Sequence, residues 1–168
     1  RTDGSVPESL DLADALIERG FSIEGINIGW DVLSDGATQT KRLLRVLYPF
    51  PYRELVTREA SERNIDPLFL AALIRQESAF TPAIHSPAGA IGLMQILPST
   101  AADPGYGVNA LSGSEQEIVA RLLDPATNKR LGTDYLNAMI NKFDGDVELA
   151  LASYNQGAGK VDAVAGQD

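Results

Sequence analysis

The aspartate-proline pairs at residues 66–67 and 124–125 constrain the fold of this chain more than any other feature, because each of them marks the start of a helix. Asp66 and Asp124 are each followed by a proline. Aspartate is a favoured N-cap residue, and proline suits the first position of a helix. The sequence therefore predicts one helix that begins at Pro67 and a longer one that runs from Pro125 to Phe143.

Further segments with a helical period lie between glycine and proline breaks. They cover residues 7–19, 26–33, 37–47, 52–63 and, after an aspartate that suits an N-cap, 147–155. Residues 103–123 lack a clear period and are predicted to form a surface loop that contains a short helix. No run of alternating apolar and polar residues predicts a strand, so the expected fold class is mainly α.

The segment Tyr48-Pro49-Phe50-Pro51 separates the predicted helices into two modules, since each proline disfavours helix in the residue before it. We expect a helical segment over residues 1–47 and a separate domain over residues 48–168. Trp30 falls in the first module, where its large ring predicts a buried packing anchor between the first helices.

Composition excludes several classes of function. The 168 residues include no cysteine and one histidine, so disulfides, thiol nucleophiles and a metal centre are not expected, and no cofactor is indicated. The formal charge of −9 argues against binding to nucleic acid. The longest apolar stretches are shorter than the roughly 20 residues that a membrane-spanning helix needs, so no transmembrane segment is expected.

The helix predicted from residue 67 carries a candidate catalytic acid. Leu70, Leu73 and Ile74 lie on one face of this helix, and Glu77 takes the next position on that face. Burial without a cationic partner raises the pKa of a carboxyl group, which is what a general acid near neutral pH requires. The alternative is a carboxylate that leaves the core, reaching water or pairing with Arg75 or another basic residue.

Other polar residues stand where they could line a cleft. The glycine-containing segment from Ser86 to Gln95 could form one wall, and Gln95 offers both a donor and an acceptor. Tyr154 ends the apolar face of the last helix and Asn155 follows it. The alternatives are a solvated turn and a core tyrosine before a glycine cap. His85 lacks the partners of a catalytic triad and is expected to be solvated.

Three blocks of this sequence together resemble the signature motifs of the soluble lytic murein transglycosylase family. They are residues 75–80 (RQESAF), 86–98 (SPAGAIGLMQILP) and 153–161 (SYNQGAGKV), and the resemblance covers about residues 48–161. It implies a lysozyme-like helical catalytic domain over 48–168, incomplete at its C-terminal end because family members continue with further helix. It also implies that residues 1–47 are the end of an α-superhelix.

The resemblance implies an enzyme that cleaves peptidoglycan without water. Glu77 matches the catalytic glutamate, which would protonate the β-1,4 glycosidic oxygen between N-acetylmuramic acid and N-acetylglucosamine. As a carboxylate it would then remove the proton of the muramyl C6 hydroxyl and close a 1,6-anhydro ring. Ser86 and Gln95 match polar residues of the glycan cleft, and Tyr154 with Asn155 matches the final motif beside the glutamate.

Two alternatives stay open at the level of sequence. A goose-type lysozyme-like hydrolase would need a second carboxylate, for which Asp103 and Asp124 are the candidates. A peptidoglycan-binding scaffold without turnover is the other, because Ser153 and Gln156 stand where the family usually has alanine. Peptidoglycan glycan strands are the expected partner in each case, in the periplasm or cell envelope of a bacterium, and no protein partner is indicated.

Overall fold

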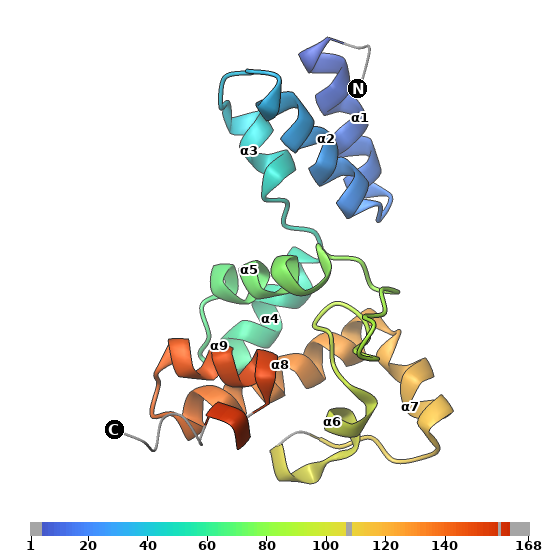
Figure 1. The fold of residues 1–168 in the computed structure, drawn as a ribbon, viewed down its shortest axis with the longest axis vertical. Helices are drawn as coiled ribbons and strands as arrows, with labels where there is room; N and C mark the ends of the chain where they lie inside the picture. The colour runs from blue at the N-terminus through green and yellow to red at the C-terminus, as the bar shows by residue number, and fades with distance from the viewer. Residues whose placement is uncertain (1–4, 107–108, 158, 162–168) are drawn as a thin grey trace.

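The computed structural model describes residues 5–106, 109–157 and 159–161, and these residues fold into helices joined by loops (Figure 1). The elements are α1 (Val6–Glu18), α2 (Ser22–Ser34), α3 (Lys41–Leu47), α4 (Arg53–Glu62), α5 (Pro67–Ser78), α6 (Pro98–Ala102), the 3-10 helix η1 (Pro104–Tyr106), α7 (Glu115–Leu122), α8 (Pro125–Lys142) and α9 (Val147–Gln156). Within this part of the chain, β structure is limited to isolated bridges. The predicted mainly α fold is confirmed.

The first three helices pack on one another around an apolar cluster of their own, at the blue-to-cyan end of Figure 1. Its buried residues are Leu10, Ala13, Val32, Leu43, Val46 and Leu47. Gly25 and Gly29 let α1 and α3 come close to α2. A Cβ atom at Gly29 would lie 2.8 Å from the side chain of Val46. This close packing also explains why α2 starts at Ser22, four residues before the predicted start.

The prediction that Trp30 is a buried anchor is wrong, because its side chain is 42% exposed. Trp30 follows Gly29, and neighbouring residues on a helix point about 100° apart. Since Gly29 faces α3, the next side chain is turned away from the small cluster. The packing of these helices depends on the two glycines of α2, which have no side chain, rather than on a large ring.

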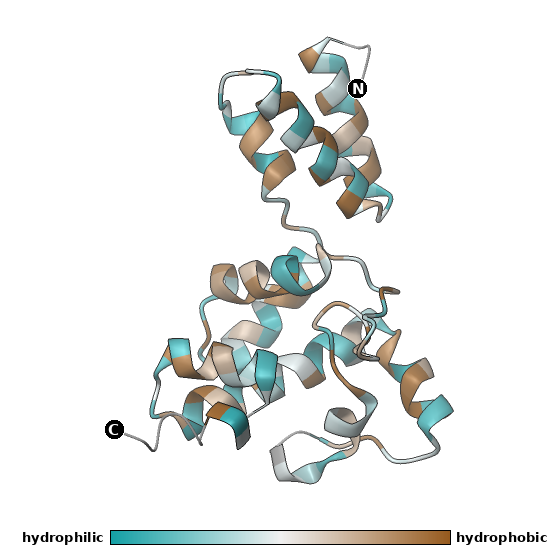
Figure 2. Ribbon diagram, in the orientation of Figure 1, coloured by the Kyte–Doolittle hydropathy of each residue, from teal (hydrophilic) through white to brown (hydrophobic). Residues whose placement is uncertain are grey.

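The other helices enclose a larger core that runs from Val56 to Ala150. In Figure 2 apolar and hydrophilic stretches alternate along the helices, and the buried apolar residues of α5 and α8 include Leu70, Ile74, Leu131 and Leu136. Residues 48–52 connect the two clusters, and Tyr52 takes a left-handed backbone conformation (φ 56°) directly before α4. Residues 1–4 and 162–168, which the predicted modules 1–47 and 48–168 include, lie outside the described residues.

Residues 103–123 contain more helix than the predicted loop with one short helix. Besides η1, they form α7, which starts with a capping box in which Ser114 and Glu117 bind each other's backbone N–H groups. Nowhere in the described ranges is a helix both long and apolar enough to span a membrane.

Candidate active site

Helix α5 places Glu77 at the edge of the larger core. The side chain of Asp66 caps the helix by accepting hydrogen bonds from the N–H groups of Leu68 (2.7 Å) and Phe69 (3.4 Å). Leu70 and Ile74 are fully buried on the inner face, whereas Glu77 is only partly buried. The apolar stripe thus ends in a carboxylate, as the sequence predicts.

The loop after α5 folds into a compact turn beside this carboxylate. Gly92 has a φ of +79°, and a Cβ atom there would lie 2.9 Å from the carbonyl oxygen of Leu122. Gln95 also has a left-handed backbone (φ 49°), and its side-chain nitrogen donates to the carbonyl oxygens of Gly92 (3.0 Å) and Ile84 (3.4 Å). Its donors are therefore used within the loop, and its side-chain oxygen is the atom available to a ligand.

Asn128 of α8 anchors this loop through the hydrogen bonds of its side-chain amide. Its side-chain oxygen accepts from the N–H of Met94 (2.8 Å), and its nitrogen donates to the carbonyl oxygens of Ile91 (2.7 Å) and Leu122 (2.9 Å). The residue is completely buried. Ser78, next to Glu77, donates to the carbonyl oxygen of Leu93 at 2.8 Å. Hydrogen bonds from α5 and α8 thus hold the loop on both sides.

Asn128 was not among the residues predicted from the sequence, although the sequence carries a signal for it. Asn128 shares a helical face with Leu131, Gly132 and Tyr135, all of which are buried. Glu77 was identified by the same kind of pattern, a polar residue at one end of an apolar stripe. Since a buried amide must satisfy both its donors and its acceptor, the same pattern could have predicted a structural hydrogen-bond anchor here.

Tyr154 of α9 reaches the same loop from the far end of the core. Its hydroxyl donates to the carbonyl oxygen of Met94 at 2.7 Å, and its ring lies 5.2 Å from that of Tyr135, tilted by 50°. Burial raises the pKa of the Tyr154 phenol well above its usual value, and the charge of Glu77 adds to this effect, followed by that of Tyr135. The phenol therefore keeps its proton and orients the loop.

These elements surround a cleft of about 450 Å³ that contains all five candidate residues. The full lining is Glu77, Ser86, Ala88, Ala90, Gln95, Ile96, Leu97, Ser99, Thr100, Tyr135, Tyr154, Asn155, Gln156 and Gly157. Ser86 closes a turn by accepting from the N–H of Ala90 at 3.0 Å, which leaves its hydroxyl proton for a ligand. Asn155 is exposed at the rim. His85 is exposed and does not line the cleft, as predicted.

The environment of Glu77 favours the protonated form of its carboxyl group. Burial raises the pKa of Glu77 above the usual value of 4.5. No ion pair or hydrogen bond reaches this carboxyl from the described residues. The alternative that Glu77 pairs with Arg75 is wrong, because Arg75 donates to the carbonyl oxygen of Leu47 at 2.9 Å and stacks over the ring of Tyr48.

Glu77 is the only carboxylate among the described residues that line the cleft. Asp103 accepts from the N–H of Gly105 at 2.7 Å, just after α6. Asp124 caps α8 by accepting from the N–H of Thr127 at 2.8 Å, and hydrogen bonds from the side chain of Thr127 and then from its backbone are the main reason that the pKa of Asp124 is lowered. Both are structural caps outside the cleft. Over the described ranges, His, Asp and Glu side chains form no group that could hold a metal ion.

The two residues that depart from the usual final motif have different surroundings. Gln156 lines the cleft and is exposed, so it changes the shape and polarity of the rim. Ser153 is fully buried within the core, and its hydroxyl oxygen has no hydrogen-bond partner among the described residues. Only the first substitution can therefore meet a ligand directly.

The helical fold and its cleft with one carboxylate agree with the comparison with known families. The family model named Transglycosylase SLT domain matches residues 54–168. The match covers most of the chain, and the chain belongs to this family.

Curated and solved relatives agree with this assignment. The soluble lytic murein transglycosylase of Salmonella typhimurium is 38% identical over 135 residues, which are 79% of this chain and 20% of that protein. The 70-kDa soluble lytic transglycosylase SLT70 of Escherichia coli has a TM-score of 0.78 at 29% identity, covering 98% of this chain and 25% of that one. An inactive glutamate-to-glutamine mutant of lytic transglycosylase Slt from Pseudomonas aeruginosa has a TM-score of 0.68 at 32% identity, covering 89% and 23%.

These matches confirm the predicted lysozyme-like helical fold class. The chain spans about a fifth of the length of the curated relatives that it matches first. All three relatives are bacterial proteins.

Proposed function

We propose that this chain carries the catalytic site of a peptidoglycan lytic transglycosylase, which cleaves the β-1,4 bond between N-acetylmuramic acid and N-acetylglucosamine without water. The observation that carries the proposal is a single, partly buried carboxyl group, Glu77, in a cleft with Ser86, Gln95, Tyr154 and Asn155. Membership of the transglycosylase family supports the reaction class. The P. aeruginosa relative supports the role of a glutamate, since a glutamate-to-glutamine mutant of it is inactive.

In the first half of the reaction, Glu77 is the general acid. Burial raises its pKa and so favours a proton on the carboxyl group, which Glu77 gives to the glycosidic oxygen as the bond from that oxygen to C1 of the muramyl sugar breaks. N-acetylglucosamine leaves with a free 4-hydroxyl group. The positive charge that develops at C1 is stabilised by the acetamide of the muramyl sugar itself, as in substrate-assisted glycosidases.

In the second half, the same residue is the general base. The C6 hydroxyl of the muramyl sugar attacks C1, and its proton moves to the Glu77 carboxylate. The product is a 1,6-anhydro ring, and Glu77 regains the proton that it gave away. One carboxyl group serves both steps, in accordance with a cleft in which Glu77 is the only carboxylate among the described lining residues. A hydrolase that activates water with a second carboxylate is less well supported.

The other cleft residues bind and orient the glycan. The hydroxyl proton of Ser86 and the side-chain oxygen of Gln95 remain available after their bonds within the loop are made, so they can bind sugar hydroxyl and acetamide groups. Tyr154 is bound to Met94 and keeps the loop at a fixed place relative to Glu77. Asn155 at the rim contacts the ligand from the other wall.

We propose the same division of the chain as the sequence predicts. Residues 48–168 form the catalytic domain, and residues 1–47 are the end of an α-superhelix that packs before it. The separate apolar clusters on either side of the linker support this division. Because the proposed substrate is peptidoglycan, we propose that the protein acts in the periplasm or cell envelope of a bacterium.

The test is mass spectrometry of the products from purified peptidoglycan, incubated with the protein and with its Glu77→Gln variant. Anhydromuramyl products that only the unmutated protein releases are the expected result. Products with reducing ends would contradict the lyase reaction and favour a hydrolase. Binding to peptidoglycan without any product would contradict turnover and favour a scaffold. Exposed Glu62 supplies a matched control, because Glu62→Gln makes the same chemical change outside the cleft.

A further inference from the structure

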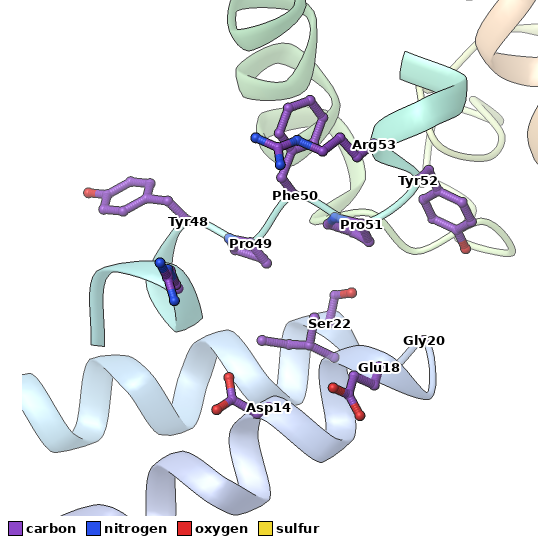
Figure 3. A pocket seen from close by; sticks show the side chains of 12 residues that line it. Asp14, Glu18, Gly20, Ser22, Tyr48, Pro49, Phe50, Pro51, Tyr52 and Arg53 are labelled. Atoms are coloured by element: carbon purple, nitrogen blue, oxygen red, sulfur yellow. The ribbon is translucent and has the colours of Figure 1, made fainter. Parts of the chain in front are cut away.

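A second and larger cavity lies where the N-terminal helices face the linker to α4 (Figure 3). Its volume is about 600 Å³. One wall is formed by the end of α1 and the start of α2. The other wall is the linker 48–52 together with Arg45 before it and Arg53 after it. We call this cavity the linker pocket, and its charged and aromatic lining includes Asp14, Glu18, Arg45, Tyr48, Phe50 and Arg53.

Charges of both signs line the linker pocket without pairing with one another. Figure 3 shows the carboxylates of Asp14 and Glu18 on the α1 wall, on the side that faces the linker. Asp14 is held by Arg42 at 3.1 Å, whereas Glu18 takes part in no ion pair that the described residues form. Arg53 lies over the ring of Phe50, 5.4 Å from its centre, and has no carboxylate partner in the described part of the chain.

Glu18 does not help its own helix. It is the last residue of α1, where a negative charge opposes the helix dipole and is unfavourable. It is also exposed. A carboxylate that stabilises neither the helix nor an ion pair, yet lines a cavity, is available to bind a cation from a ligand.

The aromatic wall of the linker pocket is fixed in place. Pro49 and Pro51 restrict the linker backbone, and Arg75 of α5 donates to the carbonyl oxygen of Leu47 at 2.9 Å. The Arg75 guanidinium also stacks on Tyr48, 4.8 Å from the ring centre, although this ring is 57% exposed. Because the wall is held before any ligand arrives, binding there costs little ordering entropy.

Two smaller depressions on the surface of α5 connect the linker pocket with the catalytic cleft. The first, of about 300 Å³, shares Tyr48 and Phe50 with the linker pocket and extends to Ala72. The second, of about 280 Å³, extends from Ala72 to Glu77 and Asn155, which also line the cleft. Ala72 is exposed and small, so the ridge between the two depressions is low.

The distances suit a short peptide. At 1.5 Å per residue, Ala72 lies roughly 7.5 Å from Glu77 along the helix axis. An extended peptide rises about 3.3 Å per residue, so two or three residues cover this distance. A ligand that starts in the cleft and passes Ala72 therefore reaches the aromatic wall at Tyr48 within a few residues.

We propose that the linker pocket binds the charged end of the peptide stem that peptidoglycan carries on its muramyl sugar. The stem begins with a small apolar alanine, which suits the passage over Ala72. Further along it carries carboxylates and, where it contains diaminopimelate, an ammonium group. The ammonium pairs with Glu18 and Asp14, and a carboxylate pairs with Arg53 or Arg45. A glycan strand without stems carries no ammonium group, so it would leave Glu18 without an ionic partner among the described residues.

This inference rests on the proposed function, and two substrates distinguish a failure of the inference from a failure of that function. One is intact peptidoglycan, and the other is the same glycan after an amidase has removed the peptide stems. The test protein is the double variant Glu18→Gln with Arg53→Gln. We expect its KM for intact peptidoglycan to rise about threefold to tenfold, which is what the loss of two partly solvated ion pairs gives, with unchanged kcat. Its kinetics on stem-free glycan should equal those of the parent protein.

A direct binding measurement completes the test. The probe is the free stem tetrapeptide of alanine, D-glutamate, meso-diaminopimelate and D-alanine. Titration calorimetry measures its binding to the intact chain. The double variant should bind it about threefold to tenfold more weakly. Ala72→Trp places a large side chain at an exposed helix position between the two depressions. It should increase KM for intact peptidoglycan and not for stem-free glycan. Glu24→Gln on the neighbouring helix is the matched control, since Glu24 is exposed outside the pocket.

Equal kinetics of parent and double variant on both substrates would overturn the inference and leave the proposed function intact. Equal tetrapeptide binding by the two proteins would overturn it as well. A parent protein that cleaves neither substrate contradicts the proposed function instead, because stem-free glycan does not need the linker pocket. A similar loss on both substrates would show that the variants act on glycan binding and would also overturn the inference.

Discussion

Two regions of the larger core each bury a glutamate at least in part. One region supplies cationic partners for the carboxylate, and the other supplies none from the described residues. Between α4 and α8, Glu59 is 5% exposed and pairs with Arg63 at 2.9 Å and with Arg58 at 3.4 Å. Arg63 also binds Asp134 at 2.6 Å. In the cleft, Glu77 receives no such partner from the described residues, and burial raises its pKa.

The difference separates a structural carboxylate from the proposed catalytic one. A buried charge with guanidinium partners is stabilised as an anion and holds two helices together. A partly buried carboxyl group without a cation can hold a proton near neutral pH and release it during a reaction. Burial alone therefore does not identify a catalytic residue, and the missing partner is the informative feature.

The sharpest test of this comparison is to neutralise both glutamates and measure turnover. Glu77→Gln should reduce the rate of product release by a factor of about 10² to 10⁴, because the acid and the base are the same group. Glu59→Gln should leave the rate per folded molecule unchanged. The rate of soluble product release from peptidoglycan measures both variants. A loss of activity only in Glu59→Gln would reverse the assignment.

On the catalytic side of the comparison, neutral hydrogen bonds from Asn128 hold the loop that lies beside Glu77. Asn128→Ala removes the side-chain partner of the Met94 N–H and of the Ile91 and Leu122 carbonyl oxygens, of which only that of Ile91 keeps a second donor among the described residues, the N–H of Ile96. The free energy of unfolding should fall by roughly 2–4 kcal/mol, since these groups stay buried. Turnover should fall too, because the loop that carries Gln95 loses its anchor.

Urea denaturation measures the effect of Asn128→Ala, and an exposed asparagine on the same helix supplies the control. Asn141→Ala should change the free energy of unfolding by less than about 0.5 kcal/mol. If both variants were equally stable, the loop would be held by its apolar contacts alone.

On the structural side of the comparison, Glu59→Gln should lower the free energy of unfolding by roughly 1–3 kcal/mol, because Arg63 loses a buried partner. The loss is limited since Arg63 keeps Asp134. Glu62→Gln, whose side chain is 57% exposed beside the same arginine, should stay within about 0.5 kcal/mol of the parent. Chemical denaturation compares the two, and equal effects would mean that burial of the pair adds nothing.

The smallest expected effect is a gain, at Lys129 of α8. This lysine is completely buried, its ammonium nitrogen has no hydrogen-bond partner in the described part of the chain, and burial lowers its pKa to about 8. The folded protein thus holds this proton less tightly than the unfolded chain. Lys129→Met should raise the free energy of unfolding at pH 7 by roughly 1–2 kcal/mol.

The pH dependence gives the sign of the Lys129 effect independently. Below pH 8 the buried ammonium lowers stability in full, and between pH 8 and the usual lysine pKa of 10.5 this cost disappears as both states lose the proton. The difference in unfolding free energy between Lys129→Met and the parent should therefore shrink from pH 7 to pH 10. A constant difference would show that the lysine is neutral or paired throughout.

Local chemistry made most helix starts predictable. Asp66, Asp124 and Asp146 cap α5, α8 and α9 as expected, because a capping side chain acts on N–H groups only two or three residues away. The three motif blocks identified the family, and the apolar stripe pointed to Glu77. Sequence alone thus determined the helical class, the family and the candidate residues of the cleft.

Only the tertiary structure decided what surrounds these residues. The start of α2 and the exposure of Trp30 follow from contacts of Gly25 and Gly29 with other helices, which no local pattern records. Arg75 could pair with Glu77 by sequence, yet it turns to Leu47 and Tyr48. A pKa depends on the groups that other helices bring within a few ångströms. Those groups are distant in the chain, so packing alone determines which glutamate is paired and which remains free to react.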